Sequence, residues 1–242
     1  MDKRWGISID IEGFSASYES GEAGKDRAIW ALHELMDAII RVGQLAYPGD
    51  VTLDESDRIF AHQFGDGFVI VSSFEETDSS RCIAIATSLM RHMAIRGLCT
   101  KSAISVGDMA DIKGCYPDSV RFSDNGTLPL GAGLMTTIPV MGTALTKAYK
   151  LSSRVSGSVL VVDKMAFDQI PDALVVSCSN DCCFIDWRSN EHELAQRISE
   201  KSGLEFGDRD QLLDLFEKYI ETEPRPPEKW VMGSRASIGK NT

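Results

Sequence analysis

The chain has 242 residues, of which 25 are Lys or Arg and 36 are Asp or Glu, so its formal net charge is −11. This length allows one large domain, or one domain with an appendage. An apolar share of 43% and a charged share of 25% are typical of a soluble globular protein and exclude a disordered or fibrous one. The acidic balance argues against general binding to nucleic acid or to an anionic membrane, because both need a basic field.

The cysteines and the N-terminal segment predict the compartment. The six cysteines are scattered and form no C-x-x-C pair of the kind that binds zinc or exchanges disulfides. Cys82, Cys182 and Cys183 have apolar neighbours, which predicts buried thiols in a reducing compartment. Asp10 and Glu12 interrupt the first apolar stretch, so it is unlike a signal peptide, and no window approaches the roughly 20 apolar residues of a membrane span. We therefore expect a cytoplasmic protein.

The first half of the chain alternates between predicted strands and helices. Alternating apolar residues predict strands, and apolar residues at three- and four-residue steps predict helices. In chain order we predict a strand at Trp5–Ile11, a helix at Asp26–Leu45, hairpin strands at Ile59–Phe64 and Phe68–Ser72, a helix at Thr77–Arg96 and a strand at Ser102–Val106. A polar, glycine-containing stretch, Ser17–Lys25, separates the first strand from the first helix.

The second half begins with a glycine-rich stretch, Asp111–Met135, which predicts a loop with short strand pieces. Beyond it we predict a helix at Thr143–Val155, a strand at Ser158–Val162, a short helix at Lys164–Ile170, strands at Ala173–Val176 and Cys182–Trp187, and a helix at Asp208–Glu221. This pattern predicts a main domain over residues 1–190 and a helical C-terminal extension with a flexible end over residues 191–242.

The order of the elements predicts an α+β fold of the ferredoxin-like type, in which helices flank a central, mostly antiparallel sheet. A Rossmann fold is not indicated, because no G-x-G-x-x-G follows the first strand and Gly131-Ala132-Gly133 is an isolated loop fragment.

Two carboxylates stand at strand ends that such a sheet can bring together. Asp10 ends the first strand, and Asp66 occupies the hairpin tip between two glycines that allow a sharp turn and the close approach of a ligand. A convergent Asp pair suits Mg²⁺ or Mn²⁺, and two such ions clamp the oxygens of a phosphoryl displacement. The alternative is that Asp66 satisfies only the backbone of its own turn. The next segment, Gly13-Phe14-Ser15, can open a helix whose free N–H groups meet a polyphosphate.

Four segments resemble the class III nucleotidyl cyclases in order and spacing, over about Arg4 to Trp187. The segment from Asp10 to Ser15 resembles the metal-binding opening of that family, and Phe64-Gly65-Asp66-Gly67-Phe68 resembles the hairpin that carries its second metal carboxylate. Ala103–Asp108 is similar to the strand that follows, and Val140–Leu151 is similar to the family's late Gly-x-x-Val-Asn-x-Ala-x-Arg-Leu segment.

This resemblance implies that residues 1–190 form a cyclase catalytic domain, with active sites between the two subunits of a homodimer. Asp10, Asp66 and the carbonyl of Ile11 would bind two Mg²⁺ or Mn²⁺ ions. The 3′-hydroxyl of a nucleoside triphosphate would attack its own α-phosphorus, yielding a cyclic nucleotide and pyrophosphate. Thr146 and Lys150 would be catalytic, since they stand at the family's Asn and Arg positions, although Lys lacks the bidentate fork of Arg.

The positions at which this family reads purines carry other residues here. His62 replaces the Lys of adenylate cyclases, and Pro139 replaces their Asp or Thr; the Glu and Cys of guanylate cyclases are also absent. This pattern resembles the pyrimidine cyclases of anti-phage Pycsar systems, in which cyclic UMP or cyclic CMP activates a separate effector. We therefore expect a uridylate cyclase. The alternatives are a cytidylate cyclase, a purine cyclase and a catalytically inactive dimerisation module.

The resemblance also implies substrate-binding roles for Gly13, Phe14, Ser15, His62, Pro139 and Lys147. Two of these roles have structural alternatives. His62 could be a strand histidine that a neighbour satisfies, and Lys147 could lie on a solvated helix face.

Overall fold

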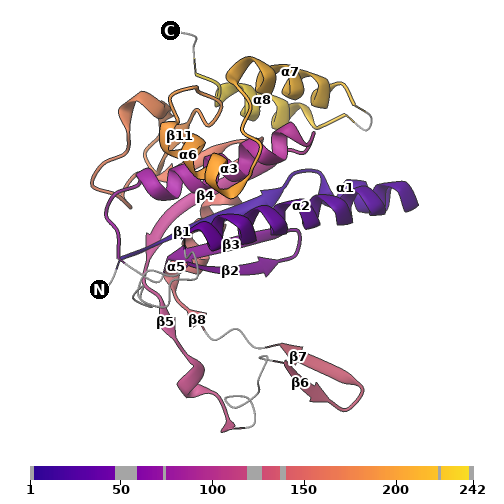
Figure 1. Cartoon of the computed structure of the whole chain (residues 1–242), viewed down its shortest axis with the longest axis vertical. Coiled ribbons are helices and arrows are strands. Elements are labelled where there is room, and N and C mark those ends of the chain that lie inside the picture. The colour runs from indigo at the N-terminus through magenta and orange to yellow at the C-terminus, as the bar shows by residue number, and fades with distance from the viewer. Residues whose placement is uncertain are drawn as a thin grey trace.

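The computed structural model describes residues 3–46, 59–72, 75–118, 127–136, 140–222 and 225–239. It contains a seven-stranded, mostly antiparallel sheet with the strand order β10-β11-β9-β4-β1-β3-β2, shown in Figure 1. The predicted α+β class and the mostly antiparallel central sheet are therefore confirmed. The strands of this sheet are β1 (Arg4–Ile11), β2 (Ile59–Phe64), β3 (Gly67–Ser72), β4 (Thr100–Gly107), β9 (Leu160–Asp163), β10 (Val175–Cys178) and β11 (Cys182–Ile185).

Strand β1 occupies the middle of the sheet, antiparallel to β3 on one side and to β4 on the other. The hairpin β2–β3 is thus the direct neighbour of the first strand, as the sequence predicted. Among the described residues, the one parallel pairing of this sheet joins β4 to β9. Figure 1 shows the helices α2 (Glu22–Ala46) and α3 (Ser80–Ile95) running across the strands.

The side chains of β1 alternate between two chemically different faces. Trp5, Ile7 and Ile9 are fully buried in the main core together with apolar residues of α2 and α3. The opposite face carries Gly6, Ser8 and Asp10 and is covered by α5 (Thr143–Ser152). Asp10 therefore lies on the thinner, α5 side of the sheet.

Helix α5 approaches this face backbone to backbone. A Cβ atom on Gly6 would overlap the carbonyl oxygen of Ala144, and a Cβ atom on Gly107 would overlap the amide nitrogen of Ala144. The carboxylate of Asp108 accepts a bond from the amide of Thr143 at 2.7 Å and so satisfies the first turn of the helix. Two glycines and one capping aspartate fix where α5 begins.

Two predicted segments are wrong in detail, and one stretch without a predicted element is helical. The polar stretch Ser17–Lys25 is divided between α1 (Phe14–Glu19) and the start of α2, two helices that pack against each other. The stretch Lys164–Ile170 is not a helix, because it is a series of turns in which Gln169 pairs with Asp78 in an isolated bridge. The stretch Ala173–Val176 begins in a 3₁₀ turn, and the strand β10 follows it.

The C-terminal part contains α6 (Glu193–Ser202), α7 (Arg209–Ile220) and α8 (Glu228–Ala236). Helix α7 matches its prediction and is capped by Asp208, whose side chain accepts the amide of Gln211 at 2.8 Å. Helices α6 and α7 pack against α3, and Leu212 reaches the main core. The predicted flexible end, residues 240–242, lies outside the described residues.

A projection leaves the sheet after β4, as Figure 1 shows. The two-residue strands β5 (Ala110–Asp111) and β8 (Val140–Met141) pair at its base, and the hairpin of β6 (Thr127–Leu130) and β7 (Gly133–Thr136) lies farther out. These are the short strand pieces that the glycine-rich stretch predicted.

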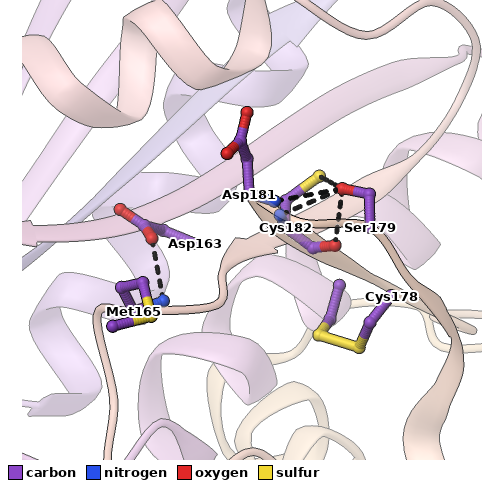
Figure 2. Close-up of a disulfide and its surroundings, with 7 residues drawn as sticks. Asp163, Met165, Cys178, Ser179, Asp181 and Cys182 are labelled. Carbon is purple, nitrogen blue, oxygen red and sulfur yellow. Dashed lines mark hydrogen bonds between the residues drawn. A yellow bond between two sulfur atoms is a disulfide. The ribbon is translucent and has the colours of Figure 1, made fainter.

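The cysteines only partly match the prediction of buried thiols. Cys82, Cys99 and Cys182 are buried free thiols, but Cys178 and Cys183 form a disulfide across the hairpin β10–β11, shown in Figure 2. The reason is their direct pairing in the register of the two strands, which the sequence spacing does not reveal. Among the described residues, no helix has the length and apolarity needed to cross a membrane.

Candidate functional site

The register of β1 and β3 brings the two predicted carboxylates to one place. Asp10 is paired with Gly67, the residue that directly follows Asp66 at the hairpin tip. A Cβ atom on Gly67 would lie 2.9 Å from Oδ1 of Asp10 and 2.7 Å from the carbonyl oxygen of Ile9. Gly65 turns the hairpin with a positive φ of 62°. The two glycines therefore let the tip carrying Asp66 fold close against Asp10.

The environment of Asp10 disfavours its charged form. Burial, and next the negative charge of Asp66, raise the pKa of Asp10 to about 6, while Lys101 opposes this shift. Its side chain is still 36% exposed, so a ligand can reach the carboxylate. At neutral pH the carboxylate is ionised beside a second negative charge, an arrangement that a bound cation would stabilise.

Lys101 is the residue of this site that sequence reasoning missed. It lies opposite Asp10 in the antiparallel register of β1 and β4. Its Nζ lies 4.0 Å from Oδ2 of Asp10 and 3.0 Å from Oε1 of Glu12. The register of two strands far apart in the chain is the only signal that could have found it. One ammonium group therefore links the carboxylates on both sides of Ile11.

The C-terminal helices hold the loop that follows Asp10. The indole Nε1 of Trp230, in α8, donates to Oε2 of Glu12, and the hydroxyl of Tyr219, in α7, donates to the carbonyl oxygen of Glu12 at 3.4 Å. Tyr219 and Trp230 also pack ring against ring, with centroids 5.5 Å apart. A Cβ atom on Gly13 would lie 3.2 Å from the Tyr219 oxygen. The loop after Asp10 is thus held in place by helices α7 and α8, near the C-terminal end of the described chain.

The segment after Glu12 opens a helix, as the sequence predicted. Gly13 is the N-cap of α1 with a left-handed φ of 78°, and no side chain caps the helix there. Phe14 stacks on Tyr18 with ring centroids 5.9 Å apart. Ile11 directs its side chain into the core and its own amide toward the carboxylate of Asp10. Contact of Gly13, Phe14 or Ser15 with a phosphate stays a prediction.

In the described part of the chain, the predicted residues of α5 have partners other than the two carboxylates, or are exposed. Thr146 is exposed, and its hydroxyl donates only within its own helix turn, to the carbonyl oxygen of Thr143 at 3.4 Å. Lys150 is exposed on the same helix. Lys147 donates to the carbonyl oxygen of Val106 at 3.1 Å, which ties it to the end of β4. Within the described part of one chain, none of these three residues is bonded to Asp10 or Asp66.

His62 lies on the edge strand β2 and on the α5 side of the sheet. It pairs with Val69, which in turn pairs with Ser8 of β1. Its Nε2 is buried without a hydrogen-bond partner among the described residues, and burial lowers the pKa of the ring, which keeps it neutral. In that part of the chain, therefore, no neighbour bonds to Nε2, as the structural alternative for His62 would require. Pro139 lies outside the described residues.

A small pocket opens beside Asp10 on the same face. Ser8, Asp10, Gly67 and Val69 form its floor, and Tyr149 of α5 forms one wall. Phe64 and Tyr149 expose 47% and 58% of their surface at its rim. The pocket therefore offers a carboxylate and aromatic surface to a ligand that approaches from outside the chain.

The donor set is two carboxylates and a backbone carbonyl, which are the hard oxygen ligands that Mg²⁺ and Mn²⁺ prefer. In the described ranges, no three His, Cys, Asp or Glu residues converge into a metal-binding group.

No protein-family model and no curated protein sequence matches this chain.

Proposed function

We propose that this protein is a nucleotidyl cyclase that converts UTP into 3′,5′-cyclic UMP and pyrophosphate. The observation that carries the proposal is the convergence of Asp10 and Asp66, whose mutual repulsion helps to raise the pKa of Asp10 to about 6. In the reaction the 3′-oxygen forms a bond to the α-phosphorus, the bond from that phosphorus to the pyrophosphate oxygen breaks, and the 3′-hydroxyl proton leaves to solvent. The strand order β4-β1-β3-β2 supports the ferredoxin-like core expected of such an enzyme.

The residues at the site fit divalent cations. Two carboxylates held together, one with a raised pKa, form a charge excess that a cation relieves. Asp10 and Asp66 would hold two Mg²⁺ or Mn²⁺ ions, with the carbonyl of Ile11 as a further ligand. When bound, such ions lower the pKa of the 3′-hydroxyl and neutralise the triphosphate.

The surrounding residues position this pair. Glu12 binds the ammonium of Lys101 at 3.0 Å, which holds that positive charge at the edge of the site, 4.0 Å from Oδ2 of Asp10. Trp230 fixes the other oxygen of Glu12. These contacts keep Asp10 anionic enough to bind metal at neutral pH, because a nearby cation favours the carboxylate.

A second copy of the chain would complete the site. Thr146 and Lys150 are exposed on α5, where they can reach a partner's triphosphate to donate a hydrogen bond and a positive charge. Exposed apolar residues on the projection support contact between subunits, since Leu130 and Met141 are 58% and 62% exposed. A homodimer with shared sites would therefore give these two residues a role although neither is bonded to Asp10 in the described part of one chain.

The preference for a pyrimidine rests on His62. Its buried Nε2 needs a partner, and a site that leaves a polar group unpaired with the wrong ligand discriminates strongly against that ligand. His62 lies on the edge strand and on the same face of the sheet as Asp10, a position that supports contact with the base. Pro139, the second base-reading position, offers no side-chain hydrogen bond.

The test is a competition among ATP, GTP, CTP and UTP at equal concentrations with Mn²⁺, read by the mass of the cyclic product. We expect cyclic UMP, and loss of at least 100-fold in Asp10→Asn and Asp66→Asn, as expected when metal ligands are removed. Asp181→Asn, at an aspartate whose side chain is 77% exposed in the β10–β11 turn, is the matched control and should retain activity. Cyclic CMP or a purine product would correct the base, and no product with either metal would indicate an inactive dimerisation module.

A further inference from the structure

A second pocket lies between the sheet and the C-terminal helices. Its walls come from the end of α3, the start of β4, the residues after β11 and the inner side of α7. Most of its lining is apolar, including Leu98, Leu212 and Phe216. One charged side chain, that of Arg188, enters this lining.

Arg188 is buried with too few partners. Only 1% of its surface is exposed, and its Nη2 donates to the carbonyl oxygen of Ser158 at 3.4 Å. Its Nε and Nη1 are buried and have no hydrogen-bond partner in the part of the chain that the structure describes. Such groups cost free energy unless water or an ion pairs with them. Two donors of one guanidinium are therefore available to a ligand in the pocket.

The neighbouring acidic groups are already engaged. Oδ2 of Asp186 lies 2.5 Å from Nη1 of Arg209 and also accepts the amide of Gly239 at 3.0 Å. Burial raises the pKa of the Cys99 thiol to about 12, so this group is neutral at pH 7. Arg188 itself keeps its charge, because burial lowers its pKa only to about 10. The positive charge of Arg188 thus has no dedicated counter-charge in the described chain.

We propose that this pocket binds a small monovalent anion of the halide class against an unpaired donor of Arg188. One buried cation calls for one negative charge, and the apolar walls favour an anion that loses its hydration shell easily. The rings of Trp187 and Phe216 lie 3.9 Å and 5.2 Å from the guanidinium carbon. They restrict the guanidinium to one plane, which fixes the directions in which its unpaired donors point.

This anion site is placed to stabilise α7. Phe216 and Tyr219 of α7 line the pocket, and Tyr219 also donates to the backbone of Glu12. Neutralising Arg188 removes the main electrostatic cost of closing α7 over it. The anion would therefore strengthen the support of the loop that follows Asp10, whatever reaction takes place at Asp10 and Asp66.

The experiment compares thermal unfolding in sodium bromide and in sodium gluconate at equal ionic strength. Equal ionic strength matches the screening of charges in the two salts. Gluconate is too large to enter the pocket, so only bromide can occupy the anion site. For the wild-type chain we expect bromide to raise Tm by about 2–4 °C with saturation, a shift that one occupied site produces in a chain of this size. Arg188→Met should lose this shift. Arg154→Gln, at an arginine whose side chain is 66% exposed, should retain it.

A direct measurement covers the case in which Arg188→Met does not fold. Crystals of the wild-type chain soaked in sodium bromide should give an anomalous peak in contact with Nε or Nη1 of Arg188. Density there without an anomalous signal would be water and would overturn the proposal. A bromide shift that is equal in the wild-type and Arg188→Met chains would overturn it as well. Neither readout depends on cyclase activity, so both stand apart from the proposed function.

Discussion

Lys101 faces Asp10 directly across the β1–β4 pair, with its Nζ 4.0 Å from Oδ2 of Asp10. The same ammonium lies 3.0 Å from Glu12. Lys101 therefore lowers the pKa that burial and Asp66 raise, and the balance of these three effects leaves the value at about 6. The cation binding proposed for this site depends on this balance, because the carboxylate must be ionised at neutral pH.

Replacing Lys101 by Met should raise the pKa of Asp10 above about 6, because only the neighbouring cation is removed. Carbon-13 NMR of the Asp carboxyl groups would measure the titration directly. Lys101→Arg keeps the charge and should leave the value close to that of the wild-type chain. An Asp10 titration that does not move in Lys101→Met would show that Lys101 has no electrostatic role.

Asp10→Asn should stabilise the metal-free protein at neutral pH. Folding raises the pKa of Asp10 from 3.8 to about 6. Between these two pH values, the folded chain therefore holds a proton on Asp10 that the unfolded chain has lost. Wild-type stability therefore falls as pH rises from about 4 to about 6, and the Asn variant lacks this fall. Because the side chain is 36% exposed, we expect a gain of only about 1 kcal/mol at pH 7.

Urea unfolding in EDTA at pH 4 and pH 7 would measure this difference. Asp181→Asn, at the exposed aspartate, is the control and should show no pH-dependent gain. A gain from Asp10→Asn that is equal at both pH values would contradict the raised pKa.

Gly107→Ala should be strongly destabilising. Its Cβ atom would overlap the backbone of Thr143 and Ala144, which cannot move without lifting α5 from the sheet. Overpacking of this kind costs about 1–3 kcal/mol. Gly114→Ala is the matched control, because no atom lies within 4 Å of its Cβ position, and it should change the free energy of unfolding by less than about 0.5 kcal/mol. Equal effects would mean that α5 does not pack as described.

Trp230→Phe should weaken the support of the Asp10 loop. The variant keeps the ring contact with Tyr219 but removes the indole donor to Glu12. Loss of a hydrogen bond to a charged group costs about 1.5–3 kcal/mol. A double-mutant cycle with Glu12→Gln would isolate the pair, and a coupling energy near zero would show that the bond is not formed in solution.

Much of the site was predictable because its signals are local. The alternation of Trp5–Ile11 marks a strand with one buried face, and the glycines around Asp66 mark the tip that returns to it. The opening of a helix at Gly13-Phe14-Ser15 was predicted, but the helical form of Ser17–Lys25 was missed because this stretch has no apolar periodicity. The helix predicted at Lys164–Ile170 is absent because Gln169 pairs with Asp78.

The remaining features depend on contacts between distant residues. Lys101 reaches Asp10 through strand register, and the disulfide of Cys178 with Cys183 follows from direct opposition of the two residues across a hairpin. Arg188 stands in an ordinary polar sequence after Trp187 and gives no sign of its burial. Spacing along the chain cannot predict such contacts, because it does not fix which strands and helices meet.

The bond between Trp230 and Glu12 joins α8 to the loop after β1. During synthesis, residue 12 leaves the ribosome long before residue 230, so the first strand and its hairpin must assemble without that support. The nascent protein therefore carries the loop after β1 without its bond to Trp230 until α8 emerges. Ordering of this loop is one of the last events in the maturation of the chain.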